Sequence, residues 1–508
     1  MAREHQLCVI RAGRAERVSF TGTPLLSEIL LENGFPVRRP CGGRGVCRKC
    51  ALRAEGGIDG LPDDAGRVLA CQARLRGNAT VWLPEAEEAA RGGEAAASDR
   101  QEDAPEGRGT GIGGPEGATA AAPGEECFGF AADVGTTTLA LRLHSLQTGR
   151  VLAEETRENP QTGVAADVMG RIQAALEGRG ALLAHLVSDA LEGLLTAACA
   201  GAGVPRERVR RGVIAGNTTM LYLLTGRDPA SLAAAPYAAD CLFDSEIPWH
   251  GARVLLPRCV SAFFGADALC AVLRSGMCDG GETALLCDVG TNGEMALWHD
   301  GRLWTASVAA GPVFEGAGIR CGCTGIPGAI DRVWPFGGGL QAHTIGDAAP
   351  VGLCGSGLLD AVAAALDLGE VDAEGTMEAE RWPVAGGVAL YPEDIRAVQL
   401  AKAAMAAGLQ TLMESAGVTA ETVQKCFLAG SFGSALNLRS AARIGLIPGR
   451  LVACTETMGN GALAGASRLL TEPGQRESLR RIAAAAVPVA LGGNDRFAAH
   501  YLRAMRFA

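Results

Sequence analysis

The sequence predicts an α/β protein in which a small β-rich domain precedes a larger body with an internal duplication. Three observations support this fold class. Three cysteines gather in a glycine-rich segment near the N-terminus with a fourth after twenty further residues, a stretch of low complexity follows, and one strand–turn–strand pattern then occurs twice. With 508 residues, the chain is long enough for two to four domains.

Residues 1–84 are expected to form the small domain. Two strands, at 7–10 and 17–20, are joined by a turn, and a helix at 25–33 ends at Gly34, a typical residue for a helix C-terminus. Cys8 lies on the first strand, outside the cysteine-rich segment, and we expect it in the core.

Four other cysteines of this domain have the spacing C-x5-C-x2-C, with the fourth after twenty more residues. They are Cys41, Cys47, Cys50 and Cys71. A [2Fe–2S] cluster needs thiolates that converge on two irons, and a glycine-rich loop allows three of them to surround one side. A structural zinc site also uses four cysteines, but zinc knuckles usually pair two C-x-x-C units and this segment has one. We therefore expect a [2Fe–2S] cluster.

Residues 85–126 are expected to form a flexible linker. The segment is charged at its start and then rich in Gly, Ala, Pro and Glu, so it cannot bury enough apolar surface to become ordered. Its length corresponds to a span on the order of 35 Å for a flexible chain. We expect the small domain to move relative to the rest.

The body contains the repeated pattern, once in a first lobe at 127–282 and once in a second lobe at 283–508. Each copy is an apolar strand that ends in an aspartate, followed by a glycine-containing turn and a second strand. The turns carry Asp133, Gly135, Thr136 and Thr137 in the first copy and Asp288, Gly290, Thr291 and Asn292 in the second. Such a hairpin offers backbone N–H groups and hydroxyls to a phosphate, with the aspartate facing a metal ion.

A third stretch follows the apolar residues 427–429 and contains Gly430, Ser431 and Gly433, which allow the backbone to approach a flat ligand closely. The two D-x-G-T hairpins and this Ala-Gly-Ser-Phe-Gly stretch resemble the phosphate-1, phosphate-2 and adenosine motifs of the actin / sugar kinase / heat-shock chaperone superfamily. The resemblance implies a two-lobed, actin-like (ribonuclease H-like, duplicated) ATPase body. No Gx4GK[ST] motif is present, so the protein is not expected to be a P-loop enzyme.

Together with the N-terminal cysteines, these motifs resemble those of the ATP-dependent reductive activators of corrinoid proteins. The resemblance covers most of the chain except residues 86–126. It implies an ATP-hydrolysing iron–sulfur reductase that reduces Co(II) of a corrinoid protein to Co(I) by one electron. An upstream electron donor protein is implied as well, and a homodimer is left open.

The same resemblance implies roles for the residues of the body. Asp133 and Asp288 are expected on the Mg²⁺ side, acting through bound waters. Glu294 is our candidate for the carboxylate that positions water. The residues expected to hold the phosphates of ATP are Gly135, Thr136, Thr137, Gly290, Thr291 and Asn292, and those expected to line adenosine are Gly430, Ser431 and Gly433.

Several further positions keep two interpretations. The family has an Asn…Gln…Gly…Asp…Arg-Ile stretch beside the cleft, matched here by Asn159, Gln161, Asp167 and Arg171, but a turn before a capped helix explains them equally well. Asn217 either caps a helix or places a polar group near phosphate. Two stretches of small residues, 264–268 and 459–466, are expected where elements cross closely.

Composition excludes some classes of function. The net charge of −10 argues against a nucleic-acid partner, and we find no apolar run of the length of a membrane span. Seventeen cysteines without an export signal favour a cytoplasmic location.

Two alternatives to a corrinoid activator remain. One is an ATP-driven activator of another low-potential enzyme, such as an acyl-CoA dehydratase. The other is a kinase-like or chaperone-like ATP-binding protein with a redox domain.

Overall fold

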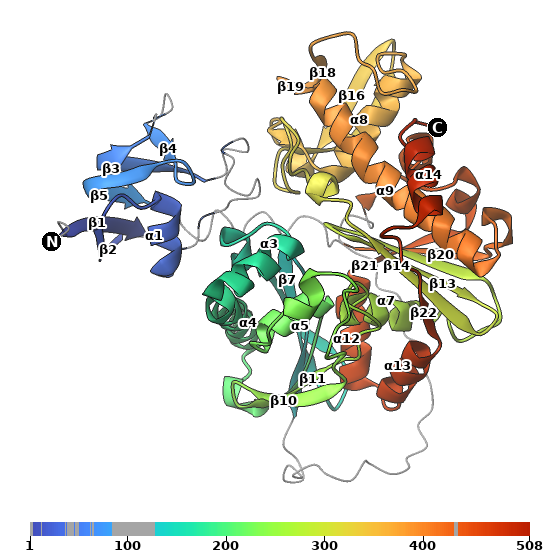
Figure 1. Ribbon diagram of the computed structural model, residues 1–508, viewed down its shortest axis with the longest axis horizontal. Coiled ribbons are helices and arrows are strands. Elements are labelled where there is room, and N and C mark those ends of the chain that lie inside the picture. Colours follow the sequence, from blue (N-terminus) through green and yellow to red (C-terminus); the bar gives the residue numbers. More distant parts are fainter. Residues whose placement is uncertain are drawn as a thin grey trace.

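The computed structural model describes residues 4–11, 13–35, 37, 45, 50–60, 62, 66–83, 127–430 and 435–508. Figure 1 shows a small N-terminal domain and a larger body made of two lobes. Each of these parts has its own β-sheet. The α/β architecture predicted from the sequence is therefore confirmed.

The N-terminal domain is a five-stranded sheet in the order β2-β1-β5-β3-β4, with one helix. Its elements are β1 (Glu4–Arg11), β2 (Arg14–Thr21), α1 (Leu26–Glu32), β3 (Ala51–Asp59), β4 (Arg67–Leu69) and β5 (Arg74–Trp82). Strands β1 and β5 are parallel and the other neighbours are antiparallel. The core forms between this sheet and helix α1, where Leu7 and Val9 of β1 meet Leu26 and Leu30.

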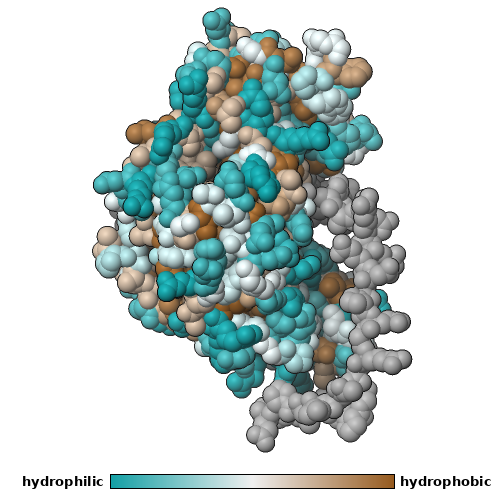
Figure 2. Space-filling model, turned by 90° about the vertical axis from the view of Figure 1, so that its right-hand side faces the viewer, coloured by the Kyte–Doolittle hydropathy of each residue, from teal (hydrophilic) through white to brown (hydrophobic). Residues whose placement is uncertain are grey.

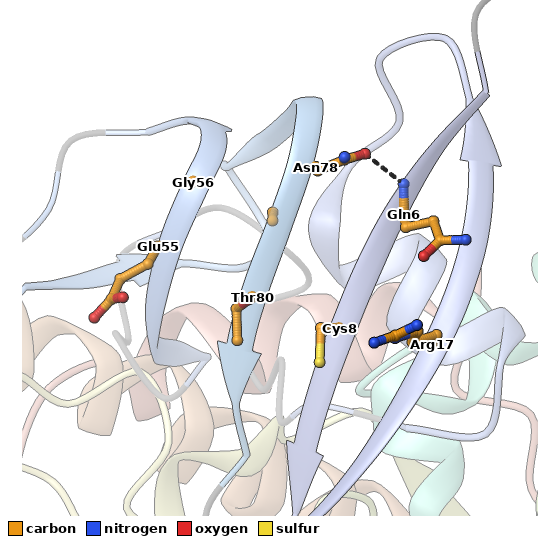
Figure 3. Close-up of a pocket in the computed structure, with 8 residues that line it drawn as sticks. Gln6, Cys8, Arg17, Glu55, Gly56, Asn78 and Thr80 are labelled. Atoms are coloured by element: carbon orange, nitrogen blue, oxygen red, sulfur yellow. Dashed lines mark hydrogen bonds between the residues drawn. The ribbon is translucent and has the colours of Figure 1, made fainter.

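Cys8 faces away from this core, so our expectation for it is wrong. Side chains of a strand alternate between the two faces of a sheet, and Leu7 and Val9 point inward. Cys8 is half-buried and lines a shallow groove on the outer face with Arg17, its partner across the β1–β2 pair, as Figure 3 shows. At the same face, the side chain of Asn78 accepts a hydrogen bond from the backbone N–H of Gln6, 2.9 Å away.

The sheet of the first lobe has six strands in the order β10-β11-β9-β6-β7-β8. The strands are β6 (Phe128–Val134), β7 (Thr138–Ser145), β8 (Val151–Glu158), β9 (Val209–Gly216), β10 (Ser245–Trp249) and β11 (Ala252–Leu256). Strands β6, β7 and β8 form an antiparallel meander, whereas β9 runs parallel to β6 and β11 runs parallel to β9.

The sheet of the second lobe repeats this plan in the order β21-β20-β12-β13-β14-β22. Its strands are β12 (Ala284–Val289), β13 (Gly293–His299), β14 (Arg302–Val308), β20 (Lys425–Ala429), β21 (Thr455–Gly459) and β22 (Ala486–Pro488). Here β12, β13 and β14 form the meander, and β20 and β21 are the parallel strands beside β12. The duplication predicted from two hairpins thus extends to whole sheets.

Helices α7 (Ala266–Ser275) and α12 (Gly461–Thr471) cross where the two lobes meet (Figure 1). Helix α7 packs on the second sheet, while Leu463 and Ala466 of α12 pack on the first. The crossing is tight because a Cβ atom on Gly465 would lie 2.0 Å from the carbonyl oxygen of Cys270. Each sheet is therefore covered by a helix from the other lobe, α7 from the first lobe on the second sheet and α12 from the second lobe on the first sheet.

Further helices cover the outer faces of the sheets. In the first lobe they are α3 (Val168–Ala174), α4 (Gly180–Ala202), α5 (Thr218–Leu224) and α6 (Ala230–Ala233). In the second lobe they are α8 (Gly355–Asp367), α9 (Pro392–Ala416), α11 (Leu438–Arg443) and α14 (Asp495–Ala504). Helix α13 (Gln475–Ala484) instead packs beside α7, on the face of the second sheet that α7 covers. Two small sheets complete this lobe, formed by β15 (Ala329–Phe336), β16 (Gly339–Thr344) and β17 (Gly352–Leu353), and by β18 (Trp382–Ala385) and β19 (Val388–Leu390).

Within the part of the chain that the structure describes, one helical stretch, Val168–Ala202, is long and apolar enough by length and composition to cross a membrane, although we expected no such run. In the structure its helix α4 packs against β7 and β8, with Leu183, Leu191 and Leu195 fully buried. Core helices pass the same test of length and composition. Figure 2 shows hydrophilic residues over most of one face of the molecule, with small hydrophobic areas between them.

Candidate nucleotide cleft and cysteine site

Each of the two predicted phosphate hairpins turns at a glycine. The two hairpins meet at the boundary between the lobes, which we call the cleft. In the first turn, the N–H of Gly135 donates to the carbonyl of Thr138 at 3.0 Å, and a Cβ atom on Gly135 would lie 2.6 Å from that oxygen. In the second, the N–H of Gly290 donates to the carbonyl of Asn292, also at 3.0 Å. Glycine is required in the first turn because no side chain fits there.

The two hairpins face each other, although they are far apart in the sequence. The hydroxyls of Thr137 and Thr291 lie 3.1 Å apart across the cleft. The hydroxyl of Thr291 also donates to a carboxylate oxygen of Glu315 at 2.8 Å. The predicted phosphate-binding residues of the two copies therefore converge on one place, where hydroxyls and backbone N–H groups can hold one chain of phosphates.

Carboxylates gather beside these turns. Asp133 and Asp288 are the last residues but one of strands β6 and β12, and Glu294 lies opposite Asp288 in the β12–β13 pair. Burial raises the pKa of Asp133 to about 6, and burial together with the charge of Asp133 raises the pKa of Asp288 to about 7. Burial, with Asp267 and Asp288 nearby, raises the pKa of Glu294 well above its usual value. Such a group of carboxylates is stabilised by a cation.

Our sequence interpretation missed Asp267 and Asn460 as members of this site. Asp267 lies in the first turn of α7, where burial and the charge of Asp133 raise its pKa to about 8. Asn460 donates to Asp133 at 3.0 Å and caps α12 by accepting from the N–H of Leu463. The only local signal was a polar residue at the start of each small-residue helix, so their place became visible only when both helices met the cleft.

A buried arginine supports the first hairpin from behind. Arg171 is fully buried and donates to the carbonyl of Thr136 and to the side chain of Gln161. Asn159 donates to the carbonyl of Gly135 at 2.9 Å. Burial lowers the pKa of Arg171 to about 9. These side chains fix the backbone of the turn and bring a positive charge close to the proposed phosphates.

The stretch from Asn159 to Arg171 is a turn before a capped helix, and it also lies beside the first hairpin. Asn159 accepts from the N–H of Gln161, and Asp167 caps α3 by accepting from the N–H of Gly170 at 2.7 Å. These are the caps of an ordinary turn and helix, yet the same turn also holds the hairpin.

Asn217 caps a helix, as one of our two interpretations expected, and it also contacts the first hairpin. It caps α5 by accepting from the N–H of Met220 at 2.9 Å, and its side-chain NH₂ donates to the hydroxyl of Thr136 at 3.3 Å. The cap residue is therefore also in contact with the first phosphate hairpin.

The predicted adenosine loop begins directly beside the second hairpin. Gly430 follows β20 with a left-handed φ of 94°, and a Cβ atom there would lie 2.8 Å from a carboxylate oxygen of Asp288. Glycine is needed for both reasons. Ser431 and Gly433 lie outside the described residues.

In the N-terminal domain, two of the four predicted cluster ligands are described. The sulfurs of Cys50 and Cys71 lie 3.2 Å apart, and both residues are buried in the domain core. Gly45, within the glycine-rich loop, lies against the side chain of Gln72, the residue after Cys71. Cys41 and Cys47 lie outside the described residues. The described pair fits a shared metal centre, and this geometry alone suits iron or zinc.

These features define a class of proteins in which a ferredoxin-like domain with a cysteine site precedes an actin-like nucleotide-binding body. Residues 10–76 match the family model of the 2Fe-2S iron-sulfur cluster binding domain. Residues 128–279 match the RACo middle region, and residues 282–508 match the C-terminal domain of RACo, the ASKHA domain. The chain belongs to the RACo family. The first match confirms the prediction of a [2Fe–2S] domain over zinc, and the ASKHA fold implies ATP binding.

Known proteins with similar sequences fit this family. The corrinoid activation enzyme RamQ of Eubacterium limosum is 30% identical over 68% of this chain and 64% of its own length, somewhat under two thirds. The [Co(II) methylated amine-specific corrinoid protein] reductase of Methanosarcina barkeri is 25% identical over 70% of this chain and 72% of its own. A solved reductive activator for corrinoid, iron-sulfur protein is 25% identical, with a TM-score of 0.71 over 99% of this chain and 98% of that one.

Proposed function

We propose that this protein reactivates a corrinoid protein by reducing its cobalt from Co(II) to Co(I) with one electron, in a step that depends on ATP. The observation that carries the proposal is the union, in one chain, of a [2Fe–2S] domain and a cleft in which Thr137 and Thr291 meet. The family relationship and the names of the relatives support it.

Each half of the molecule has a distinct task in this proposal. Cys41, Cys47, Cys50 and Cys71 hold the cluster, which supplies single electrons at low potential. The hairpin threonines and N–H groups hold the phosphates of ATP. Asp133 and Asp288 hold Mg²⁺ through water molecules, which neutralises phosphate charge. The raised pKa values of these two carboxyls support a cation site, because a cation stabilises their charged forms.

ATP is needed because Co(I) forms only at a very low potential. The reduction potential of a plant-type [2Fe–2S] centre is about −400 mV, and a donor at this potential is too weak to reduce Co(II) by itself. An allosteric coupling of about 1–3 kcal/mol corresponds to roughly 40–130 mV for one electron. We therefore propose that partner binding also changes the axial ligation of the cobalt, and that ATP favours the state in which this occurs.

We also propose an electron donor and a cellular location for the protein. A separate protein supplies electrons to the cluster, and the protein acts in the cytoplasm. The seventeen cysteines support the location, since a reducing compartment keeps such thiols from pairing.

The test is an anaerobic assay with the reduced full-length protein and two candidate partners, a methylated-amine-specific corrinoid protein and a corrinoid iron–sulfur protein. With Mg-ATP, the absorbance of Co(II) should fall and that of Co(I) should appear. Without ATP, the yield of Co(I) should remain a small fraction. Equal yields with and without ATP for both partners would contradict the proposal.

A further inference from the structure

Glu315 is held rigidly at the point where the two phosphate hairpins meet. It ends the short helix η4 (Pro312–Glu315), between Gly311 and Gly316, which both have left-handed φ values. The neighbouring Phe314 is buried in the core of the second lobe. The N–H of Gly311 donates to the carbonyl of Thr291 at 2.9 Å. The helix is therefore fixed both to the core and to the second hairpin.

The carboxylate of Glu315 contacts the hydroxyls that are proposed to hold phosphate. It accepts from Thr291 at 2.8 Å, and the hydroxyl of Thr291 lies 3.1 Å from that of Thr137. Burial raises the pKa of Glu315, and hydrogen bonds from Thr291 and Thr137 act in the opposite direction. A chain of three side chains thus crosses the cleft, with the carboxylate at one end.

Glu294 has a different environment. It pairs with Asp288 across β12 and β13, and its charge is opposed by Asp267 and Asp288. This places it among the carboxylates on the cation side of the cleft. Glu315 has hydroxyl partners instead, on the side where the two hairpin tips converge.

A carboxylate beside phosphate oxygens is repelled unless a hydrogen-bond donor lies between them. Water can donate to the carboxylate while its oxygen faces phosphorus. We propose that Glu315 positions the water that attacks the γ-phosphate of ATP, an assignment that rests on the proposed function. The water oxygen forms a bond to phosphorus, and the bond from phosphorus to the bridging oxygen breaks. ADP leaves with that oxygen, and the water proton passes to the carboxylate and then to solvent.

The experiment measures ATP hydrolysis and ATP affinity of the full-length protein, with no corrinoid partner. Glu315→Gln keeps an oxygen that can accept from Thr291, so the hairpins should stay in place. We expect kcat to fall by roughly a hundredfold or more, as for loss of a general base, with the Kd for ATP within about threefold. The wild-type kcat should rise with pH as the carboxyl loses its proton, and the variant should lack this rise.

Two further variants sharpen the test. Glu315→Asp keeps the charge but withdraws it by one methylene, so kcat should fall while the pH dependence remains. Glu378→Gln, at an exposed position of the second lobe, is the matched control and should retain the wild-type kcat.

The outcomes separate this assignment from the proposed function. Wild-type kcat in Glu315→Gln or in Glu315→Asp would overturn the assignment alone. A raised Mg²⁺ requirement at unchanged kcat would also overturn it, because that result would make Glu315 a cation ligand. A wild-type protein that neither binds nor hydrolyses ATP would overturn the proposed function, and this assignment with it.

Discussion

At the scale of single residues, the cleft depends on charged groups that are stable only with a partner. Asp133 and Asp288 lie at equivalent places in the two lobes, each at the end of the first strand of a meander. Burial is the main cause of the raised pKa of both aspartates, but a hydrogen bond from Asn460 opposes it at Asp133, whereas the charge of Asp133 adds to it at Asp288. Such asymmetry between duplicated positions is expected when one ligand binds between two unlike lobes.

Removing either aspartate should stop ATP turnover without unfolding the protein. Asp288→Ala should lower the rate of Mg-ATP hydrolysis by on the order of a hundredfold or more, because a preorganised charge is lost from the phosphate site. Asp133→Ala should act similarly. The iron content and visible spectrum should stay unchanged, and Asp189→Ala, at an exposed position of α4, is the control. Parental hydrolysis in Asp288→Ala would show that the second hairpin is assigned wrongly.

The same carboxyls predict how stability depends on pH. The pKa values of Asp133 and Asp288 are raised from 3.8 to about 6 and about 7, so the folded state binds more protons than the unfolded state. Their contribution to stability is therefore complete below about pH 4 and is lost as the pH rises towards about 7.

Thermal unfolding of the protein without divalent cations measures this effect. The cleft carboxyls should lower Tm as the pH rises from about 4 to about 7, and saturating Mg²⁺ should restore it most at the higher pH. The Asp133→Asn/Asp288→Asn double variant should lose the part of the pH dependence that these two carboxyls contribute, together with the response to Mg²⁺. A Mg²⁺ response of equal size in that variant would place the cation elsewhere.

At the scale of elements, the crossing of α7 and α12 joins the lobes. Gly465 lies against the backbone of Cys270, and backbone atoms cannot move aside as a flexible side chain can. Gly465→Ala should therefore destabilise the protein by about 3 kcal/mol through overpacking. Urea unfolding measures the change.

The matched control for this element is Gly201→Ala in α4, where a Cβ atom would meet nothing within 4 Å. The same chemical change should there be neutral or stabilising by up to about 1 kcal/mol, because alanine favours a helix. Equal effects of both substitutions would show that the crossing is looser than the structure indicates.

At the scale of the whole molecule, the N-terminal domain and the body have separate sheets and separate hydrophobic cores. Removing residues 1–84 should therefore leave ATP hydrolysis and binding of the corrinoid partner intact. Reduction of Co(II) by a protein donor should stop, because the cysteines of the cluster are lost. Full reduction by the shortened chain would show that electrons take another path, and the full-length protein treated identically is the control.

The sequence alone was sufficient for features that depend on local patterns. A glycine-containing turn between two apolar strands is a local signal for a hairpin, so both phosphate hairpins could be predicted from residues such as Gly135 and Gly290. Cysteine spacing similarly indicated the cluster domain. Cys8 shows the limit even of local patterns, because alternation along the strand identifies its face only when the inward residues are known.

Only the tertiary structure determined which residues share the cleft. The contact between Thr137 and Thr291 spans 154 residues of sequence, and it exists because two sheets place equivalent turns face to face. Asp267 and Asn460 reach the carboxylates because each of their helices packs across the boundary between lobes. Glu315 joins them through a turn fixed by Gly311 and Gly316. No local pattern carries such information, because distances between these side chains depend on how two complete lobes pack together.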